Sequence, residues 1–227
     1  MNPIFLQIAL DSAQNEITVN EGLDVVDLAT KGGIVVIIIT LLSIIAVYIS
    51  LERYFTIRKA SKSDKTFLNQ IKTMVQNGNI QEAQNMCASN NSPYSRMISK
   101  GLSRIGKPLE DIRVAVENTG NLEITKLERS LPILATISGA APMLGFLGTV
   151  TGMIKTFFVL SREGDRIEPG LLSGGIYEAM VTTVAGLIVG IIAYVAYNLL
   201  TAKIDRVVYK LESTSMEFLD ILHEPAK

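Results

Sequence analysis

The sequence has very few of the residues on which many soluble enzymes depend. His223 is its only histidine, Cys87 is its only cysteine, and it contains no tryptophan. A single cysteine excludes an intrachain disulfide, and a single histidine excludes a metal cluster built from histidines and argues against a serine–histidine hydrolytic pair. The formal net charge is −1, so the chain lacks the basic excess typical of proteins that bind nucleic acid, and no nucleic-acid partner is expected.

Hydrophobic residues make up 48% of the 227 residues, and they gather in three long uncharged runs. The runs cover residues 32–51, 131–154 and 179–202, and the second continues past Lys155 to Leu160. Each has about the ~20 apolar residues that the hydrocarbon core of a bilayer requires. Buried core helices of a soluble protein are the alternative, but three such runs in one short chain favour transmembrane helices.

Charges beside these runs predict the orientation of the helices. The residues before the first run are mainly acidic: Asp11, Glu16, Glu21, Asp24 and Asp27, with Lys31. The residues after it are basic: Arg53, Arg58, Lys59, Lys62 and Lys65. The third run is again followed by basic residues: Lys203, Arg206 and Lys210. Because cytoplasmic loops carry the excess of Lys and Arg, we expect an external N-terminus and a cytoplasmic C-terminus.

Together these features predict an all-α membrane protein with three transmembrane helices. We expect the second and third helices to extend into a cytoplasmic helical bundle. The expected segments are an external N-terminal segment (1–31), transmembrane helices (32–52, 131–160 and 174–202), a cytoplasmic helical domain (53–130), an external loop (161–173) and a cytoplasmic C-terminal helix and tail (203–227).

Apolar residues of the cytoplasmic segment recur at helical spacing, with breaks at Gly78, at residues 90–93 and at Gly106. Pro108 suits the first turn of a helix that we expect to run on into the second transmembrane helix. Cys87 falls on an apolar face, where a small buried residue is the expected role and a reactive thiol is the alternative. No glycine-rich phosphate loop followed by Lys-Ser or Lys-Thr occurs, so no nucleotide site is expected.

Small residues form a stripe along each of the last two transmembrane helices. The stripe of the second helix contains Gly145, Thr149, Gly152 and Thr156, with Gly148 beside it. The stripe of the third contains Ala179, Thr183, Gly186, Gly190 and Ala193. Small residues let helix backbones approach closely where no hydrophobic effect drives association. The expected packing positions are Gly145, Gly148, Gly152, Gly186, Gly190 and Pro142.

Two threonines of these stripes indicate a polar path in addition to packing. Thr149 lies 11 residues from Leu160, or roughly 16 Å along the helix, and Thr183 lies nine residues from Gly174, or roughly 14 Å. The two hydroxyls therefore reach nearly the same depth on antiparallel helices. A threonine hydroxyl that bonds back to its own helix is the alternative, but the matched depth favours a polar path.

The expected path has no carboxylate at its middle. Glu178 lies nearer the outside than Thr183 and shares a helix face with Thr182. Threonine does not titrate at biological pH, so a proton path would need a titratable group from a partner protein. The candidate ion-path residues are Thr149, Thr183, Thr182, Glu178 and Thr156, and no catalytic or metal-ligating residue is expected.

Two motifs carry a family resemblance. Residues 141–153, APMLGFLGTVTGM, resemble the second-helix signature of ExbB and TolQ proteins, and residues 176–187, IYEAMVTTVAGL, resemble their third-helix signature. Leu51-Glu52-Arg53, after the first helix, is also similar. The resemblance to the MotA/TolQ/ExbB family covers nearly the whole chain from Leu23 onward, including the order and orientation of the helices. The two motifs together are specific.

This resemblance implies the channel-forming subunit of an ion-driven motor in the bacterial inner membrane, with a periplasmic N-terminus. ExbB-like proteins form a ring-shaped homo-oligomer, commonly a pentamer, around transmembrane helices of an ExbD-like partner. A membrane aspartate of that partner would supply the missing titratable group. The proton motive force would drive the motor, and a TonB-like protein would transmit the work to outer-membrane transporters. Thr149 and Thr183 match the pore threonines of the family, Glu178 matches its acidic position, and no cofactor or enzyme activity is implied.

Two residues depart from the family pattern. Thr182 stands where a small apolar residue is frequent, and Lys155 is unusual at its position, where we expect its ammonium group to reach the outer surface. The extra hydroxyl leaves Na⁺ as an alternative to H⁺ as the coupling ion, because sodium favours more oxygen ligands than a proton path needs.

Other functions stay open at this point. A TolQ-like role in envelope constriction, or a gliding or flagellar stator, would use the same ion path, although the MotA branch usually has a further membrane helix. A non-conducting membrane scaffold with a cytoplasmic interaction domain is an alternative of another class. An intramembrane enzyme would need a histidine, paired midplane carboxylates or a metal set, which the three runs lack.

Overall fold

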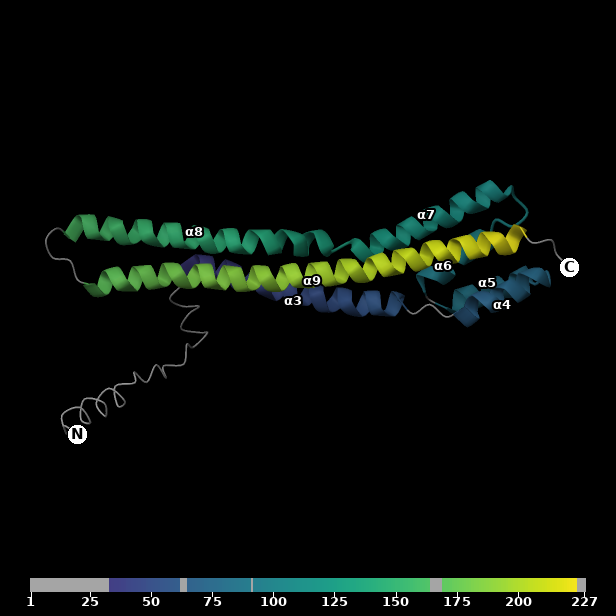
Figure 1. Ribbon diagram of the computed structural model, residues 1–227, viewed down its shortest axis with the longest axis horizontal. Helices are drawn as coiled ribbons and strands as arrows, with labels where there is room; N and C mark the ends of the chain where they lie inside the picture. Colours follow the sequence, from purple (N-terminus) through teal and green to yellow (C-terminus); the bar gives the residue numbers. More distant parts are fainter. Residues whose placement is uncertain (1–32, 62–64, 91, 164–168, 224–227) are drawn as a thin grey trace, which may run out of the picture. The chain divides into compact units, whose positions relative to one another are not determined.

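The computed structural model describes residues 33–61, 65–90, 92–163 and 169–223, and every regular element in these ranges is an α-helix. The helices are α3 (Gly33–Ala60), α4 (Lys65–Gln76), α5 (Ile80–Ser89), α6 (Pro93–Leu102), α7 (Leu109–Glu128), α8 (Leu131–Glu163) and α9 (Pro169–His223) (Figure 1). The predicted all-α class is confirmed. The predicted segment 1–31 and part of the loop 161–173 lie outside the described residues.

Within the described residues, three helical stretches are long and apolar enough to cross a membrane, and they include α3, α8 and α9. These helices have 28, 33 and 55 residues, whereas the hydrocarbon core of a bilayer needs ~20. Since α9 is unbroken over its whole length, it continues well past the predicted third transmembrane helix into the polar C-terminal part of the chain.

The second transmembrane helix differs from the expectation in one respect. The helix that begins after Pro108 does not run unbroken into it, because a turn at Arg129 and Ser130 separates α7 from α8. Pro132 contributes to the break, because it has no N–H to donate to the carbonyl oxygen of Glu128, four residues before it. A guanidinium nitrogen of Arg53, on α3, donates to the carbonyl oxygen of Lys126 at 3.0 Å and so pairs a carbonyl at the end of α7.

The short helices are separated where the sequence predicts breaks. Gly78 and Gly106 have φ angles of +77° and +95°, in the left-handed region that glycine adopts without steric cost. Ser92 and Ser95 form a capping box in front of α6, in which the Ser95 N–H donates to the Ser92 hydroxyl at 3.1 Å. Pro93 occupies the first turn of that helix, where its missing N–H costs nothing.

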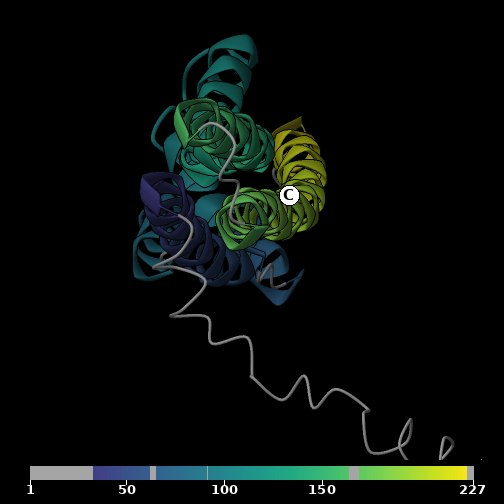
Figure 2. The same cartoon turned by 90° about the vertical axis from the view of Figure 1, so that its left-hand side faces the viewer.

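The described residues form two compact units. The first unit contains residues 33–40, 144–163 and 169–186, and the second contains residues 41–143 and 187–223, apart from the ranges outside the description. One hydrophobic core joins the helices of the second unit. Its largest fully buried side chains include Ile57, Ile71, Met97, Val116, Leu134, Ile204 and Phe218. In that unit α3, α8 and α9 are neighbours, as the view along the helices shows (Figure 2).

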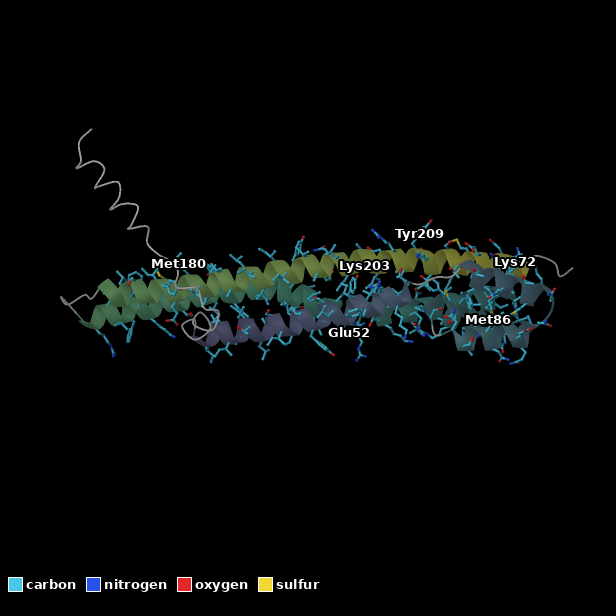
Figure 3. The ribbon with its side chains drawn as sticks, turned by 90° about the horizontal axis from the view of Figure 1, so that it is seen from below. Glu52, Lys72, Met86, Met180, Lys203 and Tyr209 are labelled. Carbon is cyan, nitrogen blue, oxygen red and sulfur yellow. The ribbon has the colours of Figure 1, made fainter. Side chains whose placement is uncertain are left out.

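A buried thiol and a cation–π contact are two further features of the second unit. Cys87 is buried, and burial raises the pKa of its thiol to about 11, so the thiol stays protonated and unreactive at neutral pH; the predicted structural role of Cys87 is confirmed. The Lys203 ammonium lies 3.8 Å from the centre of the Tyr54 ring, a cation–π contact between α9 and α3. Figure 3 shows Lys203 on α9 and Glu52, close to Tyr54 in sequence, on the neighbouring α3.

Candidate functional site

Within the first unit, α8 and α9 approach to backbone contact at glycines (Figure 1). A Cβ atom added to Gly145 would lie 2.9 Å from the carbonyl oxygen of Thr182 and 3.2 Å from the Cα of Gly186. Both distances are shorter than ordinary van der Waals contact, so a larger residue at Gly145 would force the two backbones apart. We call this contact line between α8 and α9 in the first unit the threonine seam, because four threonines line it: Thr149, Thr156, Thr182 and Thr183.

The hydroxyls of Thr149 and Thr183 meet at the centre of the seam. The Thr183 hydroxyl donates to the Gly145 carbonyl oxygen at 3.1 Å and also lies 3.4 Å from the Thr149 hydroxyl oxygen. The Thr149 hydroxyl in turn donates to the Phe146 carbonyl oxygen at 2.6 Å. The structure therefore places together two hydroxyls from residues 34 positions apart in the chain, and a chain of hydrogen bonds links them to backbone carbonyls of α8.

Thr182 is more deeply buried in the seam than Thr183. Its side chain is only 2% exposed, and its hydroxyl donates to the carbonyl oxygens of Ala179 at 2.6 Å and Gly145 at 3.3 Å. A Cβ atom on Gly148 would come within 2.5 Å of this hydroxyl oxygen. Thr182 therefore packs α9 against α8, and its expected part in ion passage stays a prediction.

The two remaining candidates of the ion path lie farther along the first unit. The Thr156 hydroxyl donates to the Gly152 carbonyl oxygen at 2.9 Å, and its side chain packs directly against Gly175. Glu178 is half-buried, and a Cβ atom on Gly33 would lie 3.2 Å from its carboxylate oxygen. Gly33 begins α3, so this carboxylate lies at the positive end of a helix dipole.

The other predicted packing positions also make close contacts. A Cβ atom on Gly152 would lie 3.0 Å from the Cβ of Ala179, in the first unit. In the second unit, a Cβ atom on Gly190 would lie 2.5 Å from the ring of Pro142 and 3.1 Å from the Ser138 carbonyl oxygen. Pro142 has no N–H to donate to that carbonyl, and glycine at position 190 leaves room for its ring.

Beside the seam, side chains of α8 line a shallow apolar groove of about 630 Å³. Thr149 lines it together with Val150, Met153, Ile154, Phe157 and Phe158. Thr149 supplies the one polar side chain among these lining residues. The groove therefore suits an apolar helix or a lipid chain that places a single polar group beside Thr149.

Two contacts in this unit were not predicted, those between Gly175 and Thr156 and between Gly33 and Glu178. The pair Gly174-Gly175 is a signal that could have pointed to the first, since glycine at the start of a transmembrane helix often marks close packing. The structure distinguishes the two glycines: a Cβ atom on Gly174 would have nothing within 4 Å, whereas one on Gly175 would overlap the Thr156 hydroxyl.

This difference gives a testable prediction. Gly175→Ala is expected to destabilise the protein by about 1–3 kcal/mol, as overpacking usually does, and Thr156→Ala in the same chain is expected to restore most of the loss. In the double variant, the Cβ of residue 156 would be the nearest remaining side-chain atom, 3.1 Å from the Cβ added at position 175. Thermal unfolding of the purified protein in detergent measures both effects. Gly174→Ala is the matched control and should melt like the wild type; equal losses at positions 174 and 175 would contradict the contact.

Comparison with known proteins identifies the family of this chain. The family model described as the MotA/TolQ/ExbB proton channel family matches residues 89–213. An ExbB homologue of Methanothermobacter thermautotrophicus is 31% identical over 189 residues, which cover 83% of this chain and 67% of the relative. An ExbB-like protein of Synechocystis is 31% identical over 83% of this chain and 72% of its own length.

A shorter similarity extends to the Tol branch: the Tol-Pal system protein TolQ of Haemophilus influenzae is 35% identical over 47% of this chain and 46% of its own length. The fold and the family match identify this chain as a membrane protein with transmembrane helices. The chain belongs to the MotA/TolQ/ExbB proton channel family. The predicted family is thus confirmed, and the family is one of transport and channel proteins.

Proposed function

We propose that this chain is the channel-forming subunit of an ExbB-like motor in the bacterial inner membrane, which uses the proton motive force together with an ExbD-like partner to energise TonB-dependent outer-membrane transport. One observation carries the proposal: the hydroxyls of Thr149 and Thr183 lie 3.4 Å apart in a seam lined by glycines. Each hydroxyl can both accept and donate a hydrogen bond, as a proton-conducting chain requires.

The partner supplies the group that binds and releases the proton. Neither Thr149 nor Thr183 titrates, and the nearest ionisable residues along their helices are Lys155 and Glu178. An ExbD-like helix with a membrane aspartate fits the apolar groove beside Thr149, because the groove offers one hydroxyl among five apolar side chains. One charge that crosses 100 mV releases ~2.3 kcal/mol, so several protons per cycle suffice for a sizeable rearrangement of the partner.

The same proposal includes a ring of several copies, with five as the expected number. The second and third transmembrane helices line its interior and the first faces lipid, with the N-terminus in the periplasm and the C-terminus in the cytoplasm. Exposed branched and aromatic side chains support the lipid-facing position of α3: Ile34, Ile37, Leu41, Ile44 and Tyr48 are each at least 57% exposed. The small-residue stripes of α8 and α9 support their position inside the ring.

The similarity to TolQ favours a second candidate, in which the same ion-driven subunit works on the cell envelope with TolR-like and TolA-like partners. The two candidates share the threonine seam and differ in the protein that receives the work. Two complementation experiments distinguish the two candidate functions. This chain and its own single-span partner are expressed in bacteria that lack ExbB and ExbD, and separately in bacteria that lack TolQ and TolR. Recovery of TonB-dependent uptake supports the first candidate, and recovery of envelope constriction supports the second.

Ion conduction itself is tested by reconstitution. We expect liposomes that contain this chain and its ExbD-like partner to take up protons when a membrane potential is applied, as reported by an enclosed pH-sensitive dye. This chain alone should conduct at least tenfold less, because the titratable group is then missing. Replacement of the partner's membrane aspartate by asparagine is the matched control and should also stop uptake. Rapid proton uptake by this chain alone would contradict the proposed division of roles.

A further inference from the structure

A cavity of about 420 Å³ lies in the second unit, between α9 and the turn that joins α7 to α8. Glu128 and Pro132 line it on one side, and Tyr197 and Thr201 line it from α9. This volume suffices for several water molecules, since one water occupies ~30 Å³ in the liquid. None of the candidate ion-path residues lines this cavity.

The polar groups around this cavity are oxygens. Glu128 contributes a carboxylate, and it has no ion pair within the described part of the chain. Because Pro132 lacks an N–H, the carbonyl oxygen of Glu128 also lacks the donor that a continuous helix would provide. Tyr197 adds a phenol. Carboxylate, carbonyl and hydroxyl oxygens are the ligands that protein sites offer to hard cations and their water.

Thr201 differs from the other hydroxyl residues of the apolar helices. The hydroxyls of Thr149, Thr151 and Thr156 donate to carbonyl oxygens of their own helix. The hydroxyl oxygen of Thr201 is buried and has no hydrogen-bond partner among the described residues. A buried hydroxyl without a partner is unfavourable, so Thr201 is poised to bond to water or to a hydrated ion that enters the cavity it lines.

The register of α9 relates this residue to the proposed ion path. Thr183 and Thr201 are 18 residues apart in one unbroken helix, which is about five turns at 3.6 residues per turn. The two threonines therefore share a face of α9. On the proposed orientation, Thr201 and Glu128 come at the cytoplasmic ends of the predicted transmembrane segments 174–202 and 131–160.

From these observations the geometry points to a hydrated cation site in this cavity, with Glu128 as the group that receives the coupling cation before its release to the cytoplasm. The inference rests on the proposed function. For a proton, the Glu128 carboxylate accepts H⁺ from a hydronium ion, which leaves as water, and then gives H⁺ to cytoplasmic water. For Na⁺, the carboxylate and the water held by Thr201 and Tyr197 bind the ion. Glu128 is exposed and has no ion pair among the described residues, so its charge attracts the entering ion, and the Arg53 guanidinium on the nearby Lys126 carbonyl weakens this attraction.

Labelling of a cysteine in the cavity tests the site without any need for conduction. The variant Thr201→Cys is made in full-length protein that also carries Cys87→Ala, in its native membrane. Small cationic and anionic methanethiosulfonate reagents are applied from the cytoplasmic side, and each rate is divided by the rate for a free thiol. We expect labelling, with a corrected preference for the cationic reagent of about thirtyfold, because a unit negative charge ~4 Å away in water favours the cation about fivefold and disfavours the anion about fivefold.

Glu128→Gln is expected to reduce this charge preference to about one. Asp205→Asn is the control and should leave the preference unchanged, because Asp205 is an exposed carboxylate of α9 that does not line the cavity. Leu199→Cys, at a 61% exposed position of α9, is the control for lipid-facing residues and should react with neither reagent. Failure to label Thr201→Cys, or a charge preference that survives Glu128→Gln, overturns the cation site.

Proton or sodium uptake by the complex with its partner then tests the role of Glu128. We expect Glu128→Gln to lower ion uptake about fivefold and Glu128→Asp to retain most of it. If Thr149→Val stops uptake while Glu128→Gln leaves it unchanged, the role of Glu128 is refuted and the proposed function stands. If the wild-type complex conducts no ion while the labelling preference is present, the proposed function is refuted and the cation site stands.

Discussion

Thr149→Val and Thr183→Val are each expected to reduce gradient-driven ion uptake at least tenfold while the complex remains assembled. Valine keeps the shape of threonine and removes the hydroxyl. The Thr183 hydroxyl makes the contacts that cross the seam, to the Gly145 carbonyl at 3.1 Å and to the Thr149 hydroxyl at 3.4 Å. The loss of one hydrogen bond between membrane helices costs only about 0.6 kcal/mol on average, which is too little to dismantle a complex held by many contacts.

Thr151→Val is the matched control for this experiment. The Thr151 hydroxyl donates to the carbonyl oxygens of Leu147 and Gly148 on its own helix, as the Thr149 hydroxyl does to that of Phe146. Among the described residues, Thr183 bonds to the Thr149 hydroxyl and not to that of Thr151. Uptake should therefore stay near the wild-type rate. Thr183→Ser, which retains the hydroxyl, should recover much of the activity that Thr183→Val loses.

The measurement is ion uptake in reconstituted liposomes, together with the amount of intact complex recovered from the membrane. Normal uptake by both the Thr149→Val and the Thr183→Val variants would leave these threonines a packing role and remove the conduction role. Thr182→Val extends the test to the coupling ion: it should be mild for a proton and severe for sodium, because sodium needs the additional oxygen.

The fold was largely predictable because its signals are local. The uncharged runs gave the three membrane helices, and Gly78 and Gly106 gave two of the breaks between the short helices, since a single glycine can provide a left-handed backbone. The break between α7 and α8 was missed for a comparable reason. Pro132 lies inside an uncharged run, and the run was interpreted as one helix although proline interrupts helical hydrogen bonding.

The candidate site was predictable only in outline. Helix rise placed Thr149 and Thr183 at the same depth, and the structure shows their hydroxyls together. Depth along a helix does not determine rotation about its axis, and neighbouring residues differ by about 100°. The sequence therefore could not tell that Thr183 would contact Thr149 while Thr182 would be buried against Gly148.

The contact between Glu123 and Arg96 had no sequence signal. Glu123 lies on α7 in a helix that reads as mostly polar, and nothing in its own segment marks it as buried. Its partner Arg96 is 27 residues away on α6. Only the packing of α6 against α7 brings the two side chains together, and that packing produces the one buried carboxylate that the described residues of the second unit contain.

The second large effect is expected at this carboxylate. Glu123 has a side chain only 4% exposed, and it forms ion pairs with Arg96 and, at 2.6 Å, with Lys126. Arg96→Met should destabilise the protein by roughly 2–4 kcal/mol, because a buried carboxylate then keeps only one, largely exposed partner. Glu123→Gln should cost less, about 1–2 kcal/mol, because the Arg96 and Lys126 side chains are 40% and 66% exposed and can reach water.

A double variant separates this pairing from simple loss of packing. Arg96→Met with Glu123→Gln should be no less stable than Arg96→Met alone, because the unpaired buried charge has gone with its partner. Glu117→Gln is the control, since the exposed ion pair of Glu117 with Arg113 is worth at most about 1 kcal/mol. Thermal unfolding of the purified complex measures the stability of the two single variants, the double variant and the Glu117→Gln control against the wild type. Additive losses in the double variant would contradict the pairing.

Acidification provides the final test of this network. Burial opposes ionisation of Glu123, yet hydrogen bonds from Arg96 and Lys126 outweigh it and lower the pKa of the carboxyl below its ordinary value. A carboxyl with a lowered pKa in the folded protein stabilises the fold above its unfolded pKa of ~4.3, and this contribution is lost as the pH falls through the folded pKa. In Arg96→Met the opposing effect of burial prevails and the folded pKa rises. This variant should therefore lose stability at a higher pH than the wild type, and a common pH profile for both would show that Arg96 does not hold the carboxylate ionised.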